Sequence, residues 1–283
     1  MENLLKQNLV NKVAVVTGGA GVLGSHLTKA LASHGASVVI IGRNEAKAVA
    51  FANELVNEGF QAIGISADVL NRKSLEDAHA KINEKFGKID ILINCAGGNN
   101  PKSTTEDEYF DFDNFTNSKT RGFFDLDLDA FNQVFGLNFT GTLLPTQVFA
   151  KDMLDRKNCT IINISSMSAF TPLTKIPAYS AAKAAINNFT QWLAVHFAKQ
   201  GIRVNAIAPG FFSSDQNRAL LWKEDGSPTA RTHKILSQTP MGRFGEPEEL
   251  VGTLLWLVDH EASGFVTGVV VPVDGGFNAY SGV

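Results

Sequence analysis

The chain of 283 residues has only two cysteines, Cys95 and Cys159, and each falls in or beside a predicted buried strand. They are therefore predicted to be small apolar core residues and not to form a disulfide. Such sparing use of cysteine suits a reducing cytoplasm, which is the predicted location. The six histidines lack the close spacing to one another or to a cysteine that binds a metal, so no protein-bound metal is predicted.

A strong excess of one charge is also missing, since 25 basic residues stand against 28 acidic ones and the formal net charge is -3. Because there is no basic stripe, nucleic acid is not a predicted partner. No apolar run approaches the roughly 18 residues of a membrane span, and the first ten residues lack a secretory apolar core, so no membrane association is predicted. No repeat or flexible linker interrupts the sequence. One domain over residues 1–283 is therefore predicted, although the length permits two domains of about 150 residues.

A regular alternation of apolar segments, by contrast, is present. Short runs rich in valine and isoleucine are predicted strands at residues 12–16, 37–41, 61–67, 90–94, 160–165, 203–208 and 269–273. Apolar residues at three- and four-residue intervals predict helices at 45–58, 74–86, 130–156, 179–199 and 247–258. Strands that alternate with helices form a parallel sheet covered on both faces, which explains why they read as continuously apolar. The predicted fold is α/β, a seven-stranded doubly wound parallel sheet of the Rossmann type.

A glycine-rich turn, Thr17 to Gly24, joins the first predicted strand to a helix with apolar residues at Leu23, Leu27 and Leu31. Glycines let the backbone turn sharply and approach a pyrophosphate, whose negative charge is stabilised by free amides at the helix start. The turn therefore predicts a dinucleotide site in residues 12–97. The alternative is a tight turn that binds nothing.

A second pattern places Lys183 four positions after Tyr179, with Ser166 thirteen positions upstream of the tyrosine. On a helix, residues four apart share a face, so the ammonium lies beside the phenol and is expected to lower its pKa. A phenol of lowered pKa can move a proton to or from an alcohol oxygen, and Ser166 would hold that oxygen. The alternative is that Tyr179 and Lys183 are an ordinary pair of side chains on the surface of a helix.

Taken together, these motifs resemble the short-chain dehydrogenases/reductases over essentially the whole sequence. The matching segments occur in the family's order at 17–24, 67–69, 94–97, Asn138, Ser166, Tyr179, Lys183 and 208–210. Two residues depart from the family pattern. Val22 stands where a glycine is usual, which places the cofactor geometry in question, and Cys95 replaces the second asparagine of the 94–97 motif.

The resemblance implies a role for each matching residue. Tyr179 would transfer the proton, Lys183 would lower its pKa and bind ribose hydroxyls, Ser166 rather than Ser165 would orient the carbonyl, and Asn138 would hold a water that links Lys183 to solvent. The residues implied to bind the cofactor are Gly18, Gly19, Gly21, Val22, Leu23, Gly24, Arg43, Asp68, Val69, Asn94, Ala96, Gly97, Tyr179, Lys183, Pro209 and Gly210.

Cofactor preference depends on the end of the second strand, where Gly42 and Arg43 replace the acid that NAD-preferring members carry. A carboxylate would bond the ribose hydroxyls and repel a 2′-phosphate, whereas glycine and arginine leave room and positive charge for it. NADP(H) is therefore favoured. NAD(H) remains the alternative, because Arg43 can also stack on adenine without discriminating.

Two variable regions bear on the substrate: residues 98–128, longer than the family's usual connection, and residues 211–238, where the family has its substrate loop. The longer one is a candidate lid, or else a solvated insertion or a subunit contact. Segments at 97–102, 143–147, 173–177 and 209–212 are similar to one branch of the family, the D-mannonate oxidoreductases that interconvert fructuronate and mannonate. Candidate ligands for a sugar acid are Asn99, Asn100, Lys102, Lys175 and Arg218.

Several alternatives stay open. The substrate can instead be another polyol, a keto-deoxy-gluconate or an acyl ketone, and a dinucleotide-binding scaffold without turnover is a more distant alternative. The resemblance also implies a homotetramer, joined partly through the helices predicted at 130–156 and 179–199, whose exposed faces would otherwise be apolar.

Overall fold

The computed structural model describes residues 8–117, 119–213 and 221–282. Seven parallel strands form one sheet in the order β3-β2-β1-β4-β5-β6-β7. The strands are β1 (Val13–Thr17), β2 (Ser37–Gly42), β3 (Ala62–Ser66), β4 (Ile91–Asn94), β5 (Cys159–Ile164), β6 (Ile202–Pro209) and β7 (Val270–Val273). The predicted seven-stranded parallel fold is confirmed, because each predicted strand is present.

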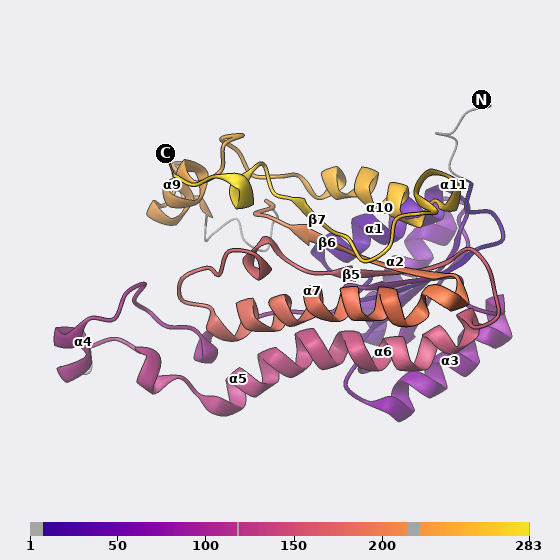
Figure 1. Ribbon diagram of the computed structural model, residues 1–283, viewed down its shortest axis with the longest axis horizontal. Coiled ribbons are helices and arrows are strands. Elements are labelled where there is room, and N and C mark those ends of the chain that lie inside the picture. The colour runs from indigo at the N-terminus through magenta and orange to yellow at the C-terminus, as the bar shows by residue number, and fades with distance from the viewer. Residues whose placement is uncertain (1–7, 118, 214–220, 283) are drawn as a thin grey trace.

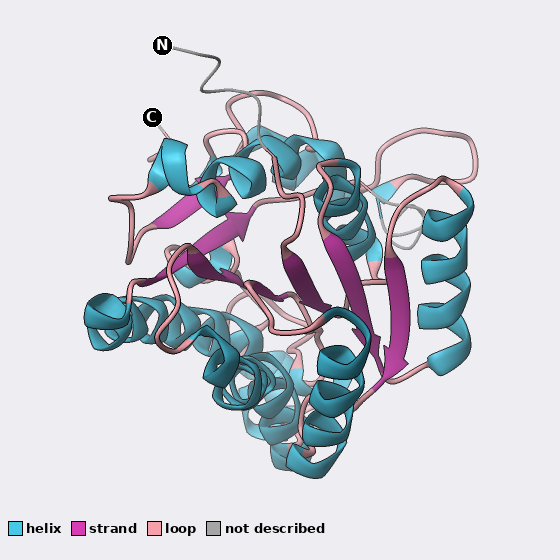
Figure 2. Cartoon of the chain, turned by 90° about the vertical axis from the view of Figure 1, so that its right-hand side faces the viewer, coloured by secondary structure: helices cyan, strands magenta, loops and turns pink. Residues whose placement is uncertain are grey.

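Helices cover both faces of this sheet (Figures 1 and 2). One layer contains α1 (Val22–Ser33), α2 (Glu45–Asn57) and α10 (Val251–Val258), and the other contains α3 (Arg72–Phe86), α5 (Leu128–Phe135), α6 (Gly141–Phe149) and α7 (Pro177–Phe197). Successive strand residues enter opposite cores: Val16 packs in the first layer's core and Val15 in the second's. Both faces of each central strand are therefore buried, as the apolar runs predicted. None of the helices in the described part of the protein has the length and hydrophobicity of a membrane span.

Shorter helices lie in the connections outside these two layers. They are α4 (Phe112–Thr116) in the long insertion, α9 (Ala230–Ser237) in the second variable region and α11 (His260–Ser263) before the last strand. In Figure 1, α4 projects away from the body of the molecule, on the same side as α9.

The single helix predicted over 130–156 is wrong in detail. The backbone forms α5, a π-helical turn at Gly136–Thr140, then α6 and a 3-10 turn that ends at Met153. The helix does not continue to Arg156, because Leu154 is extended and Asp155 adopts a left-handed backbone conformation. A π turn has one extra residue and often marks a functional position. Here that turn contains Asn138.

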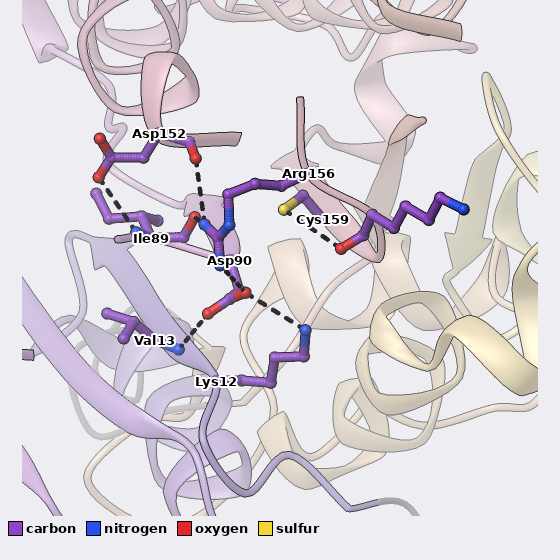
Figure 3. Close-up of polar contacts among 8 residues, drawn as sticks. Lys12, Val13, Ile89, Asp90, Asp152, Arg156 and Cys159 are labelled. Atoms are coloured by element: carbon purple, nitrogen blue, oxygen red, sulfur yellow. Dashed lines mark hydrogen bonds and ion pairs between the residues drawn. The ribbon is translucent and has the colours of Figure 1, made fainter. Parts of the chain in front are cut away.

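The amino ends of the strands are held by a buried carboxylate, Asp90 (Figure 3). Its oxygens accept hydrogen bonds from the Val13 amide (2.9 Å), the Lys12 ammonium (3.3 Å) and the Arg156 guanidinium (2.6 Å). Arg156 also donates to the Ile89 carbonyl at 2.8 Å. This network joins β1, β4 and the segment before β5 at the edge opposite the glycine turn, so the carboxyl ends of the strands are left for function.

Candidate active site

The candidate site lies where the backbone leaves β1 and β4, which are neighbours in the sheet. From β1 the backbone continues to β2 on one side, and from β4 it continues to β5 on the other, so the two connections diverge at a topological switch point. The Thr17 hydroxyl accepts hydrogen bonds from the amides of Cys95 and Ala96, both at 3.1 Å. The two strand ends are thereby held together directly beneath the glycine turn.

The glycine turn fits the pyrophosphate of a dinucleotide. Gly18 has φ +65°, and a Cβ there would lie 3.0 Å from the Ala96 Cα, while a Cβ on Gly24 would lie 2.2 Å from the Gly18 oxygen. Gly21 begins α1 with no capping side chain, and no acidic residue occurs in the first turn. The amides at the start of this helix are therefore available to an anion. Val22, which departs from the family pattern, is the first residue of α1. The closest backbone contacts of the turn are at Gly18 and Gly24, so they do not involve this valine.

Several other predicted cofactor residues follow the carboxyl ends of their strands and so lie along the same edge. Arg43 is exposed at the end of β2, beside Gly42, where a Cβ would meet no atom within 4 Å. Asp68 is half-buried after β3, and its carboxylate accepts a hydrogen bond from the Leu70 amide at 2.9 Å. Gly210 follows β6, where a Cβ would lie 2.6 Å from the Cα of Asp274.

Asn138 is fully buried, and its side chain holds the backbone that follows β4. Its amide nitrogen donates to the carbonyls of Gly98 (2.7 Å) and Val134 (2.8 Å), and its oxygen accepts from the Gly98 amide at 3.4 Å. A Cβ on Gly97 would lie 2.6 Å from this oxygen and 3.5 Å from the Lys183 Nζ. Asn138 and Lys183 therefore both border Gly97, the proximity that their predicted roles require.

Lys183 is only 5% exposed, on α7. Its ammonium donates to the Ile164 carbonyl at 2.7 Å and lies 5.5 Å from the centre of the Tyr179 ring. Removal of the ammonium from water lowers the pKa of Lys183 to about 8, and the nearby Cys95 thiol only partly opposes this shift. The neighbouring phenol and amine are thus brought together as predicted.

The predicted direction of the Tyr179 pKa is wrong in this geometry. Burial raises the pKa of Tyr179 above its ordinary value, and the hydrogen bond with Ser166, which lowers it, is the smaller effect. The Lys183 ammonium forms its hydrogen bond with Ile164 rather than with the phenol. Helical spacing correctly placed the two side chains on one face but contained no information about desolvation.

The two adjacent serines at the end of β5 have different environments. Ser165 is buried, and its hydroxyl donates to Asn187 at 2.5 Å and to the Lys183 carbonyl at 3.4 Å. Ser166 acts on Tyr179, whose pKa it lowers, as expected if the alternation of strand residues directs this serine toward the phenol. Its oxygen also accepts from the Ser168 amide at 3.2 Å and hydroxyl at 3.0 Å. Ser168 was not predicted from the sequence. A serine two residues after Ser166 is close enough to contact it, and the Ser-Met-Ser order could have indicated this contact.

The predicted substrate ligands do not form one cluster. Asn100 uses its side chain within the insertion, because its oxygen accepts from the Lys102 amide and its nitrogen donates to Gln133. Asn99 and Lys102 are exposed, and Lys175 is half-buried with φ 72°. Arg218 lies outside the described residues.

The insertion, residues 98–128, is bonded to two other segments of the protein. The Thr105 amide donates to the Lys175 carbonyl at 2.9 Å, shortly before Tyr179, and Glu108 forms an ion pair with Lys234 on α9. That ion pair, together with the positive charge of Lys175, lowers the pKa of Glu108. Residues 98–128 and 211–238 are thus joined across the sequence, a contact that no local pattern predicted.

The tip of the insertion contains a cluster of exposed phenylalanines. Neighbouring ring centres lie 5.3 to 6.4 Å apart, and each side chain is 45–67% exposed. The cluster consists of Phe110, Phe112, Phe115, Phe123 and Phe124. A surface of this kind is compatible with either the lid or the subunit contact predicted for this region.

Comparison with known proteins identifies relatives among the dehydrogenases and oxidoreductases. The family model for short chain dehydrogenases matches residues 12–225. The protein is 54% identical to the uncharacterized oxidoreductase UxuB of Bacillus subtilis, with 99% of each sequence covered.

Two solved structures are also similar. One, from Haemophilus influenzae, was proposed to be a D-mannonate oxidoreductase and contains bound NAD; it is 57% identical, with 98% of each sequence covered and a TM-score of 0.95. The other, a gluconate 5-dehydrogenase from Burkholderia cenocepacia in complex with NADP and tartrate, is 30% identical, covers 97% of this protein and 98% of its own sequence, and has a TM-score of 0.81. This protein belongs to the short-chain dehydrogenase family.

Proposed function

We propose that this protein is an NAD(P)-dependent oxidoreductase that interconverts a sugar-acid ketone and its alcohol, with D-fructuronate and D-mannonate as the substrate pair. The observation that carries the proposal is the grouping of Tyr179, Lys183 and Ser166 next to the glycine turn at the β1–β4 switch point. This set can transfer a proton at an oxygen atom while a dinucleotide lies against the turn.

When bound, the nicotinamide ring supplies or accepts the hydride. In the reducing direction, Tyr179 donates its proton to the substrate oxygen, and Ser166 holds that oxygen by a hydrogen bond. Lys183 contributes positive charge and ribose contacts. Asn138 fixes the Gly97–Gly98 backbone against Lys183, and a water held there would connect the amine to solvent.

The substrate class is supported by cations on two segments that are joined to one another. A sugar acid presents hydroxyls and a carboxylate; Lys102 lies in the segment 98–128 and Lys175 in the loop before α7, and the Thr105 amide joins these segments by its bond to the Lys175 carbonyl. The similar Haemophilus protein, proposed to be a D-mannonate oxidoreductase, points to the same substrate.

A panel of substrates tests this proposal, with oxidation of the reduced cofactor as the measured rate. The panel contains fructuronate, keto-deoxy-gluconate, a neutral ketose and an acyl ketone. Fructuronate should give the highest kcat/KM. Good turnover of another ketone without turnover of fructuronate would move the protein to a different short-chain reductase. Absence of turnover with every carbonyl compound would favour a non-catalytic dinucleotide-binding scaffold.

The proton-transfer role is tested by Tyr179→Phe. Loss of the general acid should reduce kcat by about 10²-fold or more, with dinucleotide binding changed less than twofold. Tyr280→Phe is the matched control, because Tyr280 lies in the carboxyl-terminal tail. Activity retained in Tyr179→Phe would contradict the assignment.

For the cofactor, we favour NADP(H), with NAD(H) as the alternative that the NAD-containing relative supports. The support is the open space at Gly42 and the exposed Arg43 at the end of β2. NADPH should give a higher kcat/KM than NADH. Gly42→Asp should lower the NADPH value at least tenfold and affect NADH less, since the added carboxylate repels the 2′-phosphate. A wild-type preference for NADH would reverse this choice.

We further propose a homotetramer formed partly through α7. Its outer face exposes Trp192 (56%) and Val195 (79%), an apolar surface that association would cover. Light scattering of the purified protein tests this directly, and a monomer would contradict it.

A further inference from the structure

We propose that Ser168 is a positioning residue that makes Ser166 a hydrogen-bond donor toward the reacting oxygen; this inference rests on the proposed function. Ser168 lies in the 3-10 turn Met167–Ala169 and is 2% exposed. Its hydroxyl donates to the Ser166 Oγ at 3.0 Å, and its amide donates to the same atom at 3.2 Å.

A serine hydroxyl has two acceptor lone pairs and one proton. Both lone pairs of Ser166 are used by the two donors of Ser168. Ser166 therefore retains only its proton for Tyr179 or for a substrate. A carbonyl oxygen has no proton and must be held by a hydrogen-bond donor. The two bonds from Ser168 therefore orient the Ser166 hydroxyl as the donor that the reduction requires.

The hydroxyl of Ser168 also strengthens that donor. Hydrogen bonds in series polarise one another, and a donor acting on the Ser166 oxygen makes the remaining Ser166 proton a better donor. The hydroxyl of Ser168 thus acts on Ser166, and Ser166 in turn acts on Tyr179, whose pKa it lowers. Ser165 cannot replace Ser166 in this role, because its hydroxyl is directed to Asn187.

The turn itself does not depend on the Ser168 side chain. The amides of Ala169 and Phe170 donate to the carbonyls of Ser166 and Met167, both at 3.0 Å. Ser168→Ala keeps these backbone bonds and the bond from the residue 168 amide, and removes only the hydroxyl donor. This separation makes the role of the hydroxyl measurable.

The test uses the full-length protein and whichever carbonyl compound the wild type reduces. Ser168→Ala should lower kcat about fivefold to tenfold, as expected for one lost hydrogen bond that strengthens in the transition state, with the KM for the cofactor changed less than twofold. Ser168→Thr, which keeps a hydroxyl, should restore most of kcat. The control Ser263→Ala removes another buried hydroxyl, which donates to backbone carbonyls before β7, and should leave kcat unchanged.

Two further measurements distinguish positioning from a structural effect. In a Ser166→Ala background, adding Ser168→Ala should cost less than twofold, because Ser168 acts through Ser166. The pH profile of alcohol oxidation should shift upward in Ser168→Ala, since a weaker Ser166 donor stabilises the phenolate less. Multiplicative losses in the double variant, or an unchanged kcat and pH profile, would overturn the inference. A wild type inactive toward all carbonyl compounds would overturn both this inference and the proposed function.

Discussion

Replacement of Lys183 by methionine should change the pH dependence of stability in a direction that can be stated in advance. Burial lowers the pKa of Lys183 from 10.5 to about 8. Below about pH 8 both folded and unfolded protein hold the proton, so the full cost of the buried charge opposes folding. Between about pH 8 and 10.5 only the unfolded protein holds it, and the free energy of unfolding rises with pH.

The size of this rise follows from the displaced pKa. One pKa unit corresponds to about 1.4 kcal/mol, so the change from 10.5 to about 8 amounts to about 3 kcal/mol. Methionine keeps an unbranched side chain but cannot titrate. It also loses the bond to the Ile164 carbonyl, yet that loss does not depend on pH and cancels when two pH values are compared.

Denaturant unfolding of wild type and Lys183→Met at pH 7 and pH 10 measures the effect. The wild type should gain about 2–3 kcal/mol relative to the variant between these pH values. Lys199→Met, at an exposed position after α7, is the matched control and should show a much smaller change. A wild-type-to-variant difference that is the same at both pH values would refute the reasoning, whatever happens to activity.

Three further outcomes are expected. Gly97→Ala places a methyl group 2.6 Å from a buried side-chain oxygen and should abolish turnover, whereas Gly252→Ala meets no atom within 4 Å and should be neutral in the same rate assay. Asp90→Asn should lower the free energy of unfolding by about 3 kcal/mol, measured by denaturant titration, while Glu58→Gln at an exposed ion pair should cost under about 1 kcal/mol. The rate of ketone reduction should fall as pH rises above about 8, because Lys183 then loses its charge, and a flat profile to pH 10 would contradict this.

Much of the fold was predictable because hydrophobic patterning directly reports burial. Strands such as β1 and β2 are buried on both faces, so they appear in the sequence as continuous apolar runs. The interruption of the long helix was not predictable in the same way. Apolar residues continue through the π turn at Gly136–Thr140, at Leu137 and Phe139, and nothing in the residue types marks the extra residue, so the segment reads as one helix.

The candidate site was predictable where spacing determines proximity. Tyr179 and Lys183 share a helix face, and the alternation of strand residues separates Ser165 from Ser166. Contacts between distant segments escaped this reasoning. The Glu108–Lys234 ion pair joins residues 126 positions apart, and only the folded protein brings them together.

The Tyr179 pKa shows why residue types alone do not determine chemistry. Burial raises the pKa of the phenol and lowers that of the neighbouring amine, so desolvation acts on the two groups in opposite directions. Tyr179 therefore keeps its proton at neutral pH, and Lys183 is the first of the two groups to titrate as pH rises. Ser166, limited to donating by the two bonds from Ser168, suits the binding of a ketone oxygen. Under the proposed function, Tyr179 gives its proton to the ketone oxygen during reduction and takes it back during oxidation of the alcohol.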